Sequence, residues 1–411
     1  MAVRILILSA SIGSGHVTAA KALESAFTSI EGDIVVRHED ALDFANPAFR
    51  NLYQKTYADL ANNAPELLGW IYNYTERVWT TEEHGLALER WNSGSLKKVV
   101  KDYHPDLVVC THPMPADMTS WLLCKKELET HHAIVLTDFE INPLWLCHHY
   151  SLYFVALEET KQHMLRLGYS DDRVINTGIP VHPKFSIEKD KTEMKIKHGL
   201  DPKRTTLLVS AGGAGLFSTQ ELIMCLSEVQ SNTQIVALCG SNIELKDRLE
   251  QIAAELNQPG ATPIHVQGYT TDMDEFMSAA DLLIGKAGGL TSSEALAKRL
   301  PMVIVNPIPG QEERNSDHLL EQGCAIRCNN LPVLSYKITQ VLADQAKLES
   351  MRESAGRMGR PRASFEIASA LEKLAHEGNF PCAIHPAEHK CSGFMTQSLF
   401  SESNKSGKRS V

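Results

Sequence analysis

The sequence predicts an α/β fold of two domains, each built on its own parallel sheet. Short apolar runs alternate with helix-like stretches along nearly the whole chain, a pattern typical of strand–helix units that feed a parallel sheet. The 411 residues suffice for two or three domains with sizeable cores. Hydrophobic residues make up 43% of the chain and charged residues 22%, which is the usual balance of globular domains.

The predicted strands divide into two groups of six. The first half contributes 3–8, 34–36, 106–110, 133–136, 152–156 and 174–176, and the second half contributes 206–210, 234–239, 263–266, 281–284, 302–305 and 324–327. Residues 177–185 carry two prolines and a glycine, and a charged stretch follows them, so we place a linker here. Two such sheets side by side leave a cleft along their facing carboxyl ends, where ligands bind in open α/β sheets. Residues 380–411 have no apolar periodicity, and we expect them to be disordered.

Composition excludes several functional classes. Forty basic and fifty acidic residues give a net charge of −10, which argues against a nucleic-acid partner. Nine cysteines without a CxxC pair indicate neither a zinc finger nor a disulfide scaffold, and they favour a reducing cytoplasm. The apolar stretch at the start of the chain is too short for a signal peptide, and no run of about 18 apolar residues occurs. Peripheral attachment to a membrane stays open.

The first glycine-rich turn, SASIGSGH at residues 9–16, leads from a strand into a helix. Gly13 and Gly15 allow a ligand to approach the backbone at the helix N-terminus. A nicotinamide dinucleotide site would need a third glycine where Thr18 stands, so we disfavour it. His16 at the mouth of the turn is either a structural hydrogen-bonding group or a group placed for proton transfer.

Two further strand–loop–helix segments follow in the second half. In LLVSAGGAGLFSTQE (207–221), free backbone amides at 213–216 would suit a diphosphate. In LLIGKAGGLTSSEAL (282–296), Thr291 and Glu294 have the spacing of a capping box. Glu294 therefore either caps the helix or accepts hydrogen bonds from a ribose, as acidic residues do in nucleotide-binding α/β folds.

A proline-stiffened loop, NPIPGQEERN at 306–315, comes directly after a predicted strand. It presents Gln311, Glu312 and Glu313, whose acceptors suit a ligand rich in hydroxyl groups; solvated surface charge is the alternative. Asp272 and Asp274 flank one residue, as in some metal-binding sugar-nucleotide sites. Because they stand at a predicted helix start, we favour a structural role for this pair.

Aromatic side chains are concentrated in residues 44–79. Phe49, Tyr53 and Tyr57 recur every four residues, which predicts one stripe of a helix. These aromatics, with Trp70 and Trp79, either pack on the first domain or lie at a lipid–water boundary.

Six ordered segments together resemble a known family. They are SASIGSGH at 9–16, TDFEINPLWL at 137–146, TGIPVHPKF at 177–185, GGAGL at 212–216, KAGGLTSSEAL at 286–296 and NPIPGQEERN at 306–315. The resemblance is to monogalactosyldiacylglycerol synthases and processive diacylglycerol glucosyltransferases of glycosyltransferase family 28. It runs from about residue 3 to about residue 375, across both halves.

This resemblance implies a GT-B fold, with two Rossmann-like domains facing across a cleft. It places an acceptor domain at 1–180, the linker at 181–200, a UDP-sugar donor domain at 201–360 and, at 361–379, a helix that returns to the first domain. It also implies an inverting hexosyltransferase that takes a hexose from a UDP-sugar to diacylglycerol or a related lipid and needs no metal or other cofactor. We expect such an enzyme to be cytoplasmic and peripheral on the inner face of the cell membrane.

Site roles carry over by motif position. His16 would be the general base, and the acceptor side would hold Gly13, Gly15, His112 and Asp138. The donor side would comprise a larger set, in which glycine loops approach the diphosphate, Glu294 holds the ribose and the 311–313 segment contacts the sugar: Gly213, Ala214, Gly215, Gly288, Gly289, Thr291, Glu294, Gln311, Glu312 and Glu313.

Two departures keep alternatives open. The turn before His16 lacks the longer glycine run of the peptidoglycan enzyme, which disfavours a polyprenyl acceptor. Residues 1–180 carry 15 basic and 23 acidic side chains, a net charge of −8, where a polybasic patch is usual for docking on anionic lipid. The alternatives are a transferase that uses UDP-N-acetylglucosamine on a polyprenyl-linked or other acceptor, a nucleotide-sugar epimerase or hydrolase, and a sugar-nucleotide sensor without turnover.

Overall fold

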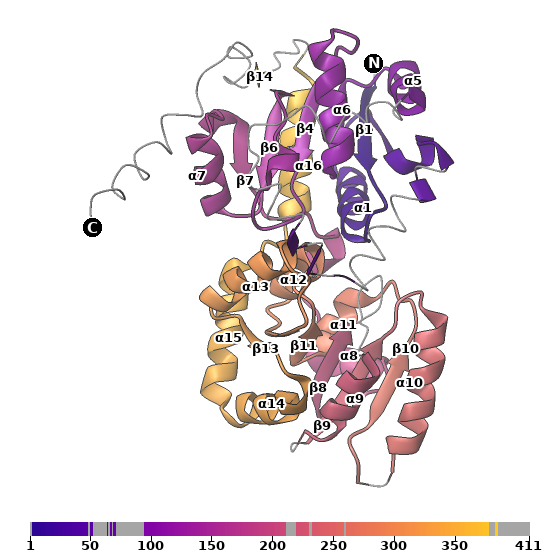
Figure 1. The fold of residues 1–411 in the computed structure, drawn as a ribbon, viewed down its shortest axis with the longest axis vertical. Helices are drawn as coiled ribbons and strands as arrows, with labels where there is room; N and C mark the ends of the chain where they lie inside the picture. The colour runs from indigo at the N-terminus through magenta and orange to yellow at the C-terminus, as the bar shows by residue number, and fades with distance from the viewer. Residues whose placement is uncertain are drawn as a thin grey trace, which may run out of the picture.

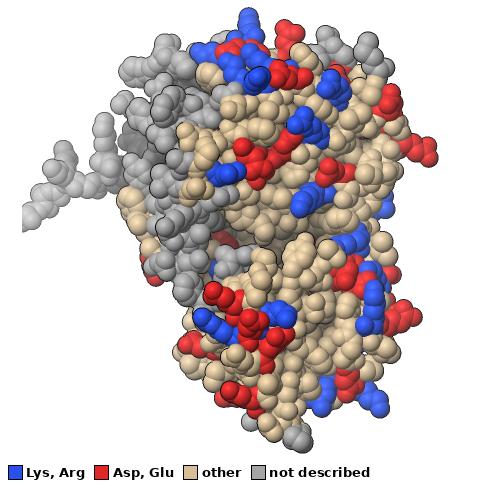
Figure 2. All heavy atoms as spheres, turned by 90° about the vertical axis from the view of Figure 1, so that its right-hand side faces the viewer, with Lys and Arg blue, Asp and Glu red and all other residues tan. Residues whose placement is uncertain are grey.

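The computed structural model describes residues 2–47, 50–51, 64, 66–67, 69–70, 94–210, 219–229, 232–258, 260–377 and 383–384. Within these ranges the chain forms two lobes stacked along the long axis, each built on a six-stranded parallel sheet (Figure 1). The predicted α/β fold with two parallel sheets is therefore confirmed. The surface is indented between the lobes, and acidic and basic side chains are interspersed on both (Figure 2).

The first sheet has the strand order β2-β1-β3-β4-β6-β7. Its strands are β1 Val3–Ser9, β2 Ile34–Asp40, β3 Leu107–Cys110, β4 His131–Val135, β6 Leu152–Val155 and β7 Val174–Asn176. The apolar runs of β3 and β4 are buried on both faces because helices cover the sheet on both sides. The edge strand β2 runs four residues past its predicted end. Its last residues are polar and only partly buried, so the apolar pattern did not mark them as strand.

The second sheet has the order β10-β9-β8-β11-β12-β13. Its strands are β8 Thr205–Ser210, β9 Thr233–Leu238, β10 Ile264–Gln267, β11 Leu282–Gly285, β12 Met302–Val305 and β13 Ala325–Cys328. Every predicted strand of this half lies within one residue of an observed strand. The sequence pattern thus located both sheets.

Helices cover the two faces of each sheet. In the first lobe they are α1 Gly15–Phe27, α5 Gly94–Tyr103, α6 Pro113–Cys124, α7 Glu158–Arg166 and α16 Ala363–Ala375. In the second lobe they are α8 Lys191–Lys197, α9 Thr219–Ser227, α10 Ile243–Leu256, α11 Met273–Ala279, α12 Gly289–Ala297, α13 Gln311–Glu321, α14 Leu334–Ala343 and α15 Gln345–Met358. Among the described residues, no helix is long and apolar enough to cross a bilayer.

Within the described residues, the chain crosses between the lobes twice. After β7 it enters the second lobe, and α16 returns to the first lobe (Figure 1). Ile367 and Leu371 of α16 share a core cluster there with Leu23 of α1. The crossings touch at Gly178, whose φ is +89° and where a Cβ would lie 2.6 Å from Arg360 Cβ. Only glycine fits this contact without strain.

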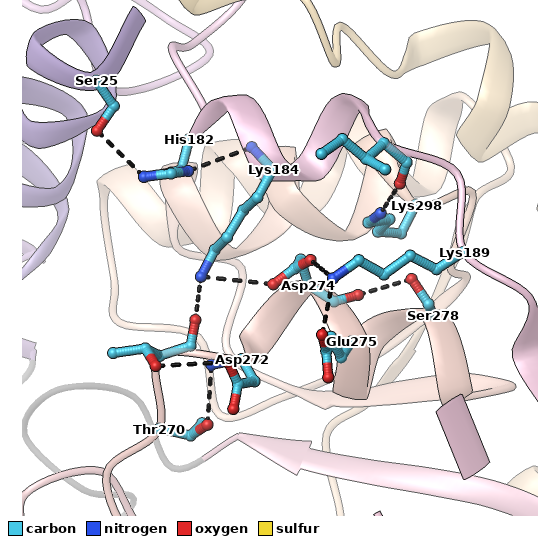
Figure 3. Close-up of polar contacts among 12 residues, drawn as sticks. Ser25, His182, Lys184, Lys189, Thr270, Asp272, Asp274, Glu275, Ser278 and Lys298 are labelled. Carbon is cyan, nitrogen blue, oxygen red and sulfur yellow. Dashed lines mark hydrogen bonds and ion pairs between the residues drawn. The ribbon is translucent and has the colours of Figure 1, made fainter. Parts of the chain in front are cut away.

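The segment expected to be a linker, 181–200, holds a 3₁₀ turn, η4 Pro183–Ser186, and helix α8. Lys189 pairs with Glu275 of α11 (Figure 3). Lys197 pairs with the same carboxylate, and both ion pairs tie this segment to the second lobe. A hydrogen bond of 3.1 Å between Ser25 Oγ of α1 and His182 Nε2 joins the segment to the first lobe.

The C-terminal tail differs locally from the expectation of disorder. Ala383–Ile384 (β14) pair antiparallel with His149–Tyr150 (β5) in a small second sheet of the first lobe. Backbone pairing of this kind carries no apolar periodicity in so short a segment, so the sequence pattern could not reveal it. The other residues of 380–411 lie outside the described residues.

Candidate functional site

His16 stands at the start of α1, at the carboxyl end of β1. The preceding loop turns at Gly13, whose φ is +73°, a conformation that favours glycine. His16 Nδ1 lies 2.8 Å from the carbonyl oxygen of Thr111 and 2.9 Å from Thr137 Oγ1. A carbonyl oxygen only accepts, so Nδ1 carries the proton and Nε2 keeps its lone pair.

Burial keeps His16 neutral. It lowers the pKa of His16 to about 4, although the hydrogen bond to the Thr111 carbonyl opposes the shift. Thr111 Oγ1 also donates to the backbone carbonyl of His16 at 3.0 Å, which fixes the start of α1 to the end of β3. A neutral imidazole with a fixed tautomer and a free Nε2 lone pair is the state that a general base requires.

A second histidine, His112, lies against the first with the opposite tautomer. It is the N-cap of α6, where its Nδ1 accepts a hydrogen bond from the backbone amide of Met114 at 3.0 Å. Burial, reinforced by His16, holds the pKa of His112 well below its usual value, so the neutral ring carries its proton on Nε2. The two ring centroids are 4.5 Å apart, and the Trp145 ring lies 6.2 Å from that of His16.

The second lobe touches this site at Thr137 and Asp138. A Cβ on Gly289 of α12 would lie 2.0 Å from the Thr137 carbonyl oxygen and 3.2 Å from Asp138 Oδ1. On the other side of Gly289, Leu290 Cδ2 would lie 3.6 Å from a Cβ on Gly15. The N-terminus of α12 therefore lies directly against the loops that carry His16 and Asp138.

Asn315 of α13 connects the lobes at the same place. Its side chain accepts from Phe139 N at 3.2 Å and donates to Ala287 O at 3.0 Å and to Asp138 Oδ1 at 3.5 Å. Burial raises the pKa of Asp138 to about 7, and the nearby Glu312 carboxylate adds to the shift while Asn315 opposes it. Asp138 thus titrates near neutral pH at the junction of the two lobes.

Glu294 lies in the second turn of α12. The helix begins at Gly289 with Gly288 as its N-cap, so the capping-box interpretation of Thr291 and Glu294 is wrong: the helix starts two residues before Thr291. Glu294 is 9% exposed, and its carboxylate has no hydrogen bond within the described part of the chain. Burial raises its pKa to about 7, with Lys184 opposing and Asp274 reinforcing the shift. Its oxygen atoms are free to accept hydrogen bonds from a ligand.

The residues at the start of α13 divide into two kinds. Glu312 Oε2 accepts from Ile308 N at 2.7 Å, and Glu313 Oε2 accepts from Gly310 N at 3.3 Å. Both carboxylates thus brace the proline loop before α13. Gln311 makes no side-chain hydrogen bond among the described residues, and its amide is available to a ligand.

Several predicted site residues lie outside the described residues. They are Gly213, Ala214 and Gly215 on the donor side, and Phe49, Tyr53, Tyr57 and Trp79 in the aromatic segment. Trp70 is described and is 61% exposed. Its neighbour Gly69 is buried, and a Cβ there would lie 2.5 Å from Pro309 Cβ. This part of the aromatic segment therefore reaches the proline loop of the second lobe.

The acidic pair at α11 is neutralised by lysines. Asp274 is 2% exposed and pairs with Lys189 at 2.6 Å and Lys184 at 3.5 Å (Figure 3). Lys184 also donates to the Thr271 carbonyl. These contacts agree with a structural role for Asp274. Asp272 is the N-cap residue of α11, but its side chain makes no capping hydrogen bond. Within the described ranges, no group of three or more His, Cys, Asp or Glu side chains could hold a metal ion.

The sequence analysis did not single out Lys286 and Asn315, which lie at the site, or Tyr269, which lies at the carboxyl edge of the second sheet. Tyr269 follows β10 and is 73% exposed at the carboxyl edge of the second sheet. Lys286 follows β11. Burial raises the pKa of Glu312, and the charge of Lys286 opposes that shift. An aromatic and a lysine directly after strands were visible signals for Tyr269 and Lys286. Asn315 had none beyond its place in the 306–315 motif.

Comparison with known proteins identifies relatives across both lobes. Residues 16–181 match the monogalactosyldiacylglycerol (MGDG) synthase family, and residues 206–373 match the glycosyltransferase family 28 C-terminal domain. A processive diacylglycerol beta-glucosyltransferase of Bacillus mycoides is 30% identical over 387 residues, which cover 92% of this chain and 96% of the relative. The protein of the same name from Bacillus subtilis is 28% identical, with 85% and 90% covered.

Solved structures show the same fold at low identity. MurG of Acinetobacter baumannii superposes with a TM-score of 0.61 at 16% identity, covering 91% of this chain and 100% of that one. Staphylococcus aureus MnaA, solved with UDP, gives 0.58 at 13% identity, with 91% and 96% covered. Anabaena HepE, solved with UDP and glucose, gives 0.52 at 14% identity, with 90% and 100% covered.

Proposed function

Because the chain belongs to glycosyltransferase family 28, among the MGDG synthases and processive diacylglycerol glucosyltransferases, we propose that it transfers a hexose from a UDP-sugar to diacylglycerol with inversion. The chain is a UDP-sugar-dependent hexosyltransferase of glycolipid synthesis with a GT-B fold. The inverting, metal-independent mechanism and the roles of single residues are the proposal. One observation carries it: His16, with Nε2 free to accept a proton, faces the lobe junction where α12 begins.

His16 is the general base in this proposal. Its Nε2 takes the proton of the acceptor hydroxyl while that oxygen attacks the anomeric carbon of the donor. The bond from the anomeric carbon to the UDP oxygen breaks, and UDP leaves with the electron pair. Attack from the face opposite the leaving group inverts the anomeric centre. A base with a pKa near 4 is unprotonated throughout the neutral range.

The second lobe binds UDP. Glu294 accepts hydrogen bonds from the ribose hydroxyls, a role supported by its buried side chain, whose carboxylate makes no hydrogen bond among the described residues. The first amides of α12, at Gly288 and Gly289, lie where helix N-termini favour phosphate groups, and the 213–215 loop is the second proposed phosphate contact. Tyr269 offers an exposed aromatic face for the uracil base.

The sugar lies between the lobes in this proposal. Gln311 contacts its hydroxyls directly, while Glu312 acts from the braced start of α13. Gly13, Gly15 and Asp138 shape the acceptor side beside His16.

Positive charge for the departing diphosphate comes from the protein itself. Lys286 stands between β11 and the N-terminus of α12. The lysine charge and the helix N-terminus both favour a negatively charged group at that place. The nearby acidic pair is unsuited to a cation, because Lys184 and Lys189 neutralise Asp274. We therefore expect turnover to persist in EDTA.

Access to a lipid acceptor places the protein at a membrane surface, and we propose peripheral attachment on the cytoplasmic face. The first lobe carries a net charge of −8 over residues 1–180. Apolar side chains such as Trp70, rather than general attraction to anionic lipid, would then provide attachment.

The test is product analysis with three donors, UDP-glucose, UDP-galactose and UDP-N-acetylglucosamine, each with and without diacylglycerol vesicles. The proposal expects a hexosyl-diacylglycerol and UDP release that depends on diacylglycerol. An altered sugar nucleotide in the absence of lipid would indicate an epimerase, and sugar and UDP without lipid would indicate a hydrolase. Bound UDP without any product would indicate a sensor.

A further inference from the structure

His16 and His112 form a pair of neutral imidazoles with complementary hydrogen-bonding ends. The Thr111 carbonyl fixes the proton of His16 on Nδ1, which leaves Nε2 as an acceptor. The Met114 amide binds Nδ1 of His112, which leaves Nε2–H as a donor. The rings meet edge to face with centroids 4.5 Å apart. The pair thus offers an acceptor nitrogen on one ring and a donor nitrogen on the adjacent ring.

The Nε2 end of the His112 ring has no hydrogen-bond partner among the described residues. His112 is 7% exposed, and its Nε2 makes no hydrogen bond within the described ranges. An N–H group that makes no hydrogen bond within the protein is available to donate to a ligand that reaches it. His112 cannot serve as the base in this state, because the nitrogen that faces the ligand already holds a proton.

We propose that His112 is a specificity-determining residue whose Nε2–H donates a hydrogen bond to an ester carbonyl of the acceptor lipid. This inference rests on the proposed function, since it assumes diacylglycerol as the acceptor. Diacylglycerol carries its hydroxyl and the adjacent ester on neighbouring glycerol carbons. The hydroxyl is the proton donor that His16 requires, and the ester carbonyl is a group that only accepts. The acceptor on His16 and the donor on His112 therefore complement the hydroxyl and the ester carbonyl of diacylglycerol, and a lipid without the carbonyl should bind more weakly.

The surroundings favour this assignment. The Trp145 ring lies 6.2 Å from His16 and is itself 1% exposed, which makes one wall of the site apolar. A hydrogen bond from a single N–H group is stronger beside such an apolar wall, because water competes poorly for the donor. The position of His112 is rigid, since capping of α6 and contact with His16 hold both edges of the ring.

The experiment compares diacylglycerol with a 1,2-dialkylglycerol of equal chain length, which keeps the hydroxyl but replaces both esters with ethers. We expect the wild-type enzyme to prefer the ester lipid by about tenfold in kcat/KM, the size of one neutral hydrogen bond. His112→Ser keeps an N-cap acceptor for α6 and removes the distant donor. Its preference should fall to about one, while the pH dependence set by His16 stays unchanged.

A matched control is available at His182. Its Nδ1 also accepts from a backbone amide, that of Lys184 at 3.2 Å, and caps η4 away from the acceptor pair. His182→Ser should keep the full ester preference. If His112→Ser does not fold, His112→Asn supplies the same cap with a shorter side chain that does not reach the position of Nε2.

Two results would overturn the inference. One is a wild-type enzyme that uses ester and ether lipids equally well, and the other is an ester preference that survives in the His112 variants. Both leave the proposed function intact, because turnover of diacylglycerol by the wild type is measured in the same series. Absence of any turnover with diacylglycerol would instead contradict the proposed function.

Discussion

Gly289 lies at the contact between the two lobes beside the proposed base, and replacing it by alanine should separate the lobes there. The added Cβ would lie 2.0 Å from the carbonyl oxygen of Thr137, a backbone atom that cannot rotate away. Ordinary contact begins at 3.4 Å, so the α12 N-terminus and the Thr137 loop must part by about 1.4 Å. Displacements of about 1 Å in an active site can lower turnover about 10²-fold.

We therefore expect Gly289→Ala to lower kcat/KM about 10²-fold while UDP binding changes only a few-fold. The donor lobe itself should not lose stability, because alanine is the better helix former by about 1 kcal/mol inside α12. Gly288→Ala is the matched control: its φ is −68°, and a Cβ there meets nothing within 4 Å. It should cost only about 1 kcal/mol at the N-cap and keep most of the activity.

The assay is steady-state UDP release with diacylglycerol vesicles, run beside calorimetric titration of each variant with UDP. Wild-type kcat/KM in Gly289→Ala would refute the idea that this contact assembles the site. Equal losses in both variants would show that the effect comes from the helix start rather than from the lobe contact.

Three further predictions address the base, the ribose contact and the membrane. His16→Gln should lower kcat by about 10² or more with UDP affinity kept, since a general base acts in the transition state; calorimetry and UDP release measure the two, and near-normal turnover would place the base elsewhere. Glu294 has a folded pKa of about 7 against 4.5 when unfolded, so the folded state holds the extra proton between these values and stability falls as pH rises through that window. Loss of this proton should also make the Glu294 carboxylate a better acceptor, so wild-type UDP affinity should rise from pH 6 to 8. Glu294→Gln should flatten the stability slope in thermal melts and remove the rise in affinity. A wild-type affinity that is flat across that range, or equal for UDP and its 2′-deoxy analogue, would contradict the ribose contact. Replacing Trp70 and Trp79 together by Ser should release the protein from vesicles, and wild-type binding should change little with salt, whose screening length is about 8 to 10 Å at ordinary ionic strength; steep loss with salt would indicate a basic patch instead.

The sheets were predictable because their signal is local. Strands such as Leu107–Cys110 and Met302–Val305 are fully buried on both faces, and a parallel sheet covered by helices requires continuous apolar runs. The edge strand β2 was predicted too short, because its last residues, up to Asp40, are polar. The pairing of β14 with β5 depends on backbone hydrogen bonds between distant segments, for which composition gives no signal.

The candidate site was only partly predictable. His16 and Glu294 stand in glycine-rich strand–helix turns, where the physical reason for a ligand is readable from the sequence. The cap expected from Thr291 and Glu294 was wrong because Gly288 already ends the extended segment, and spacing alone cannot fix where a helix begins. The tautomers of His16 and His112 depend on Thr111 and Met114, contacts that exist only after folding.

The measurement that tests the central claim most directly is the anomeric configuration of the lipid product formed from an α-linked UDP-hexose. Direct attack assisted by His16 gives a single displacement, so the new glycosidic bond should be β, as read from the coupling constant of the anomeric proton in the nuclear magnetic resonance spectrum. UDP and glycolipid should form in equal amounts. An α-linked product would mean retention of configuration, which a single attack from the face opposite UDP cannot give, and would contradict the account in which His16 acts as the base of such a transfer.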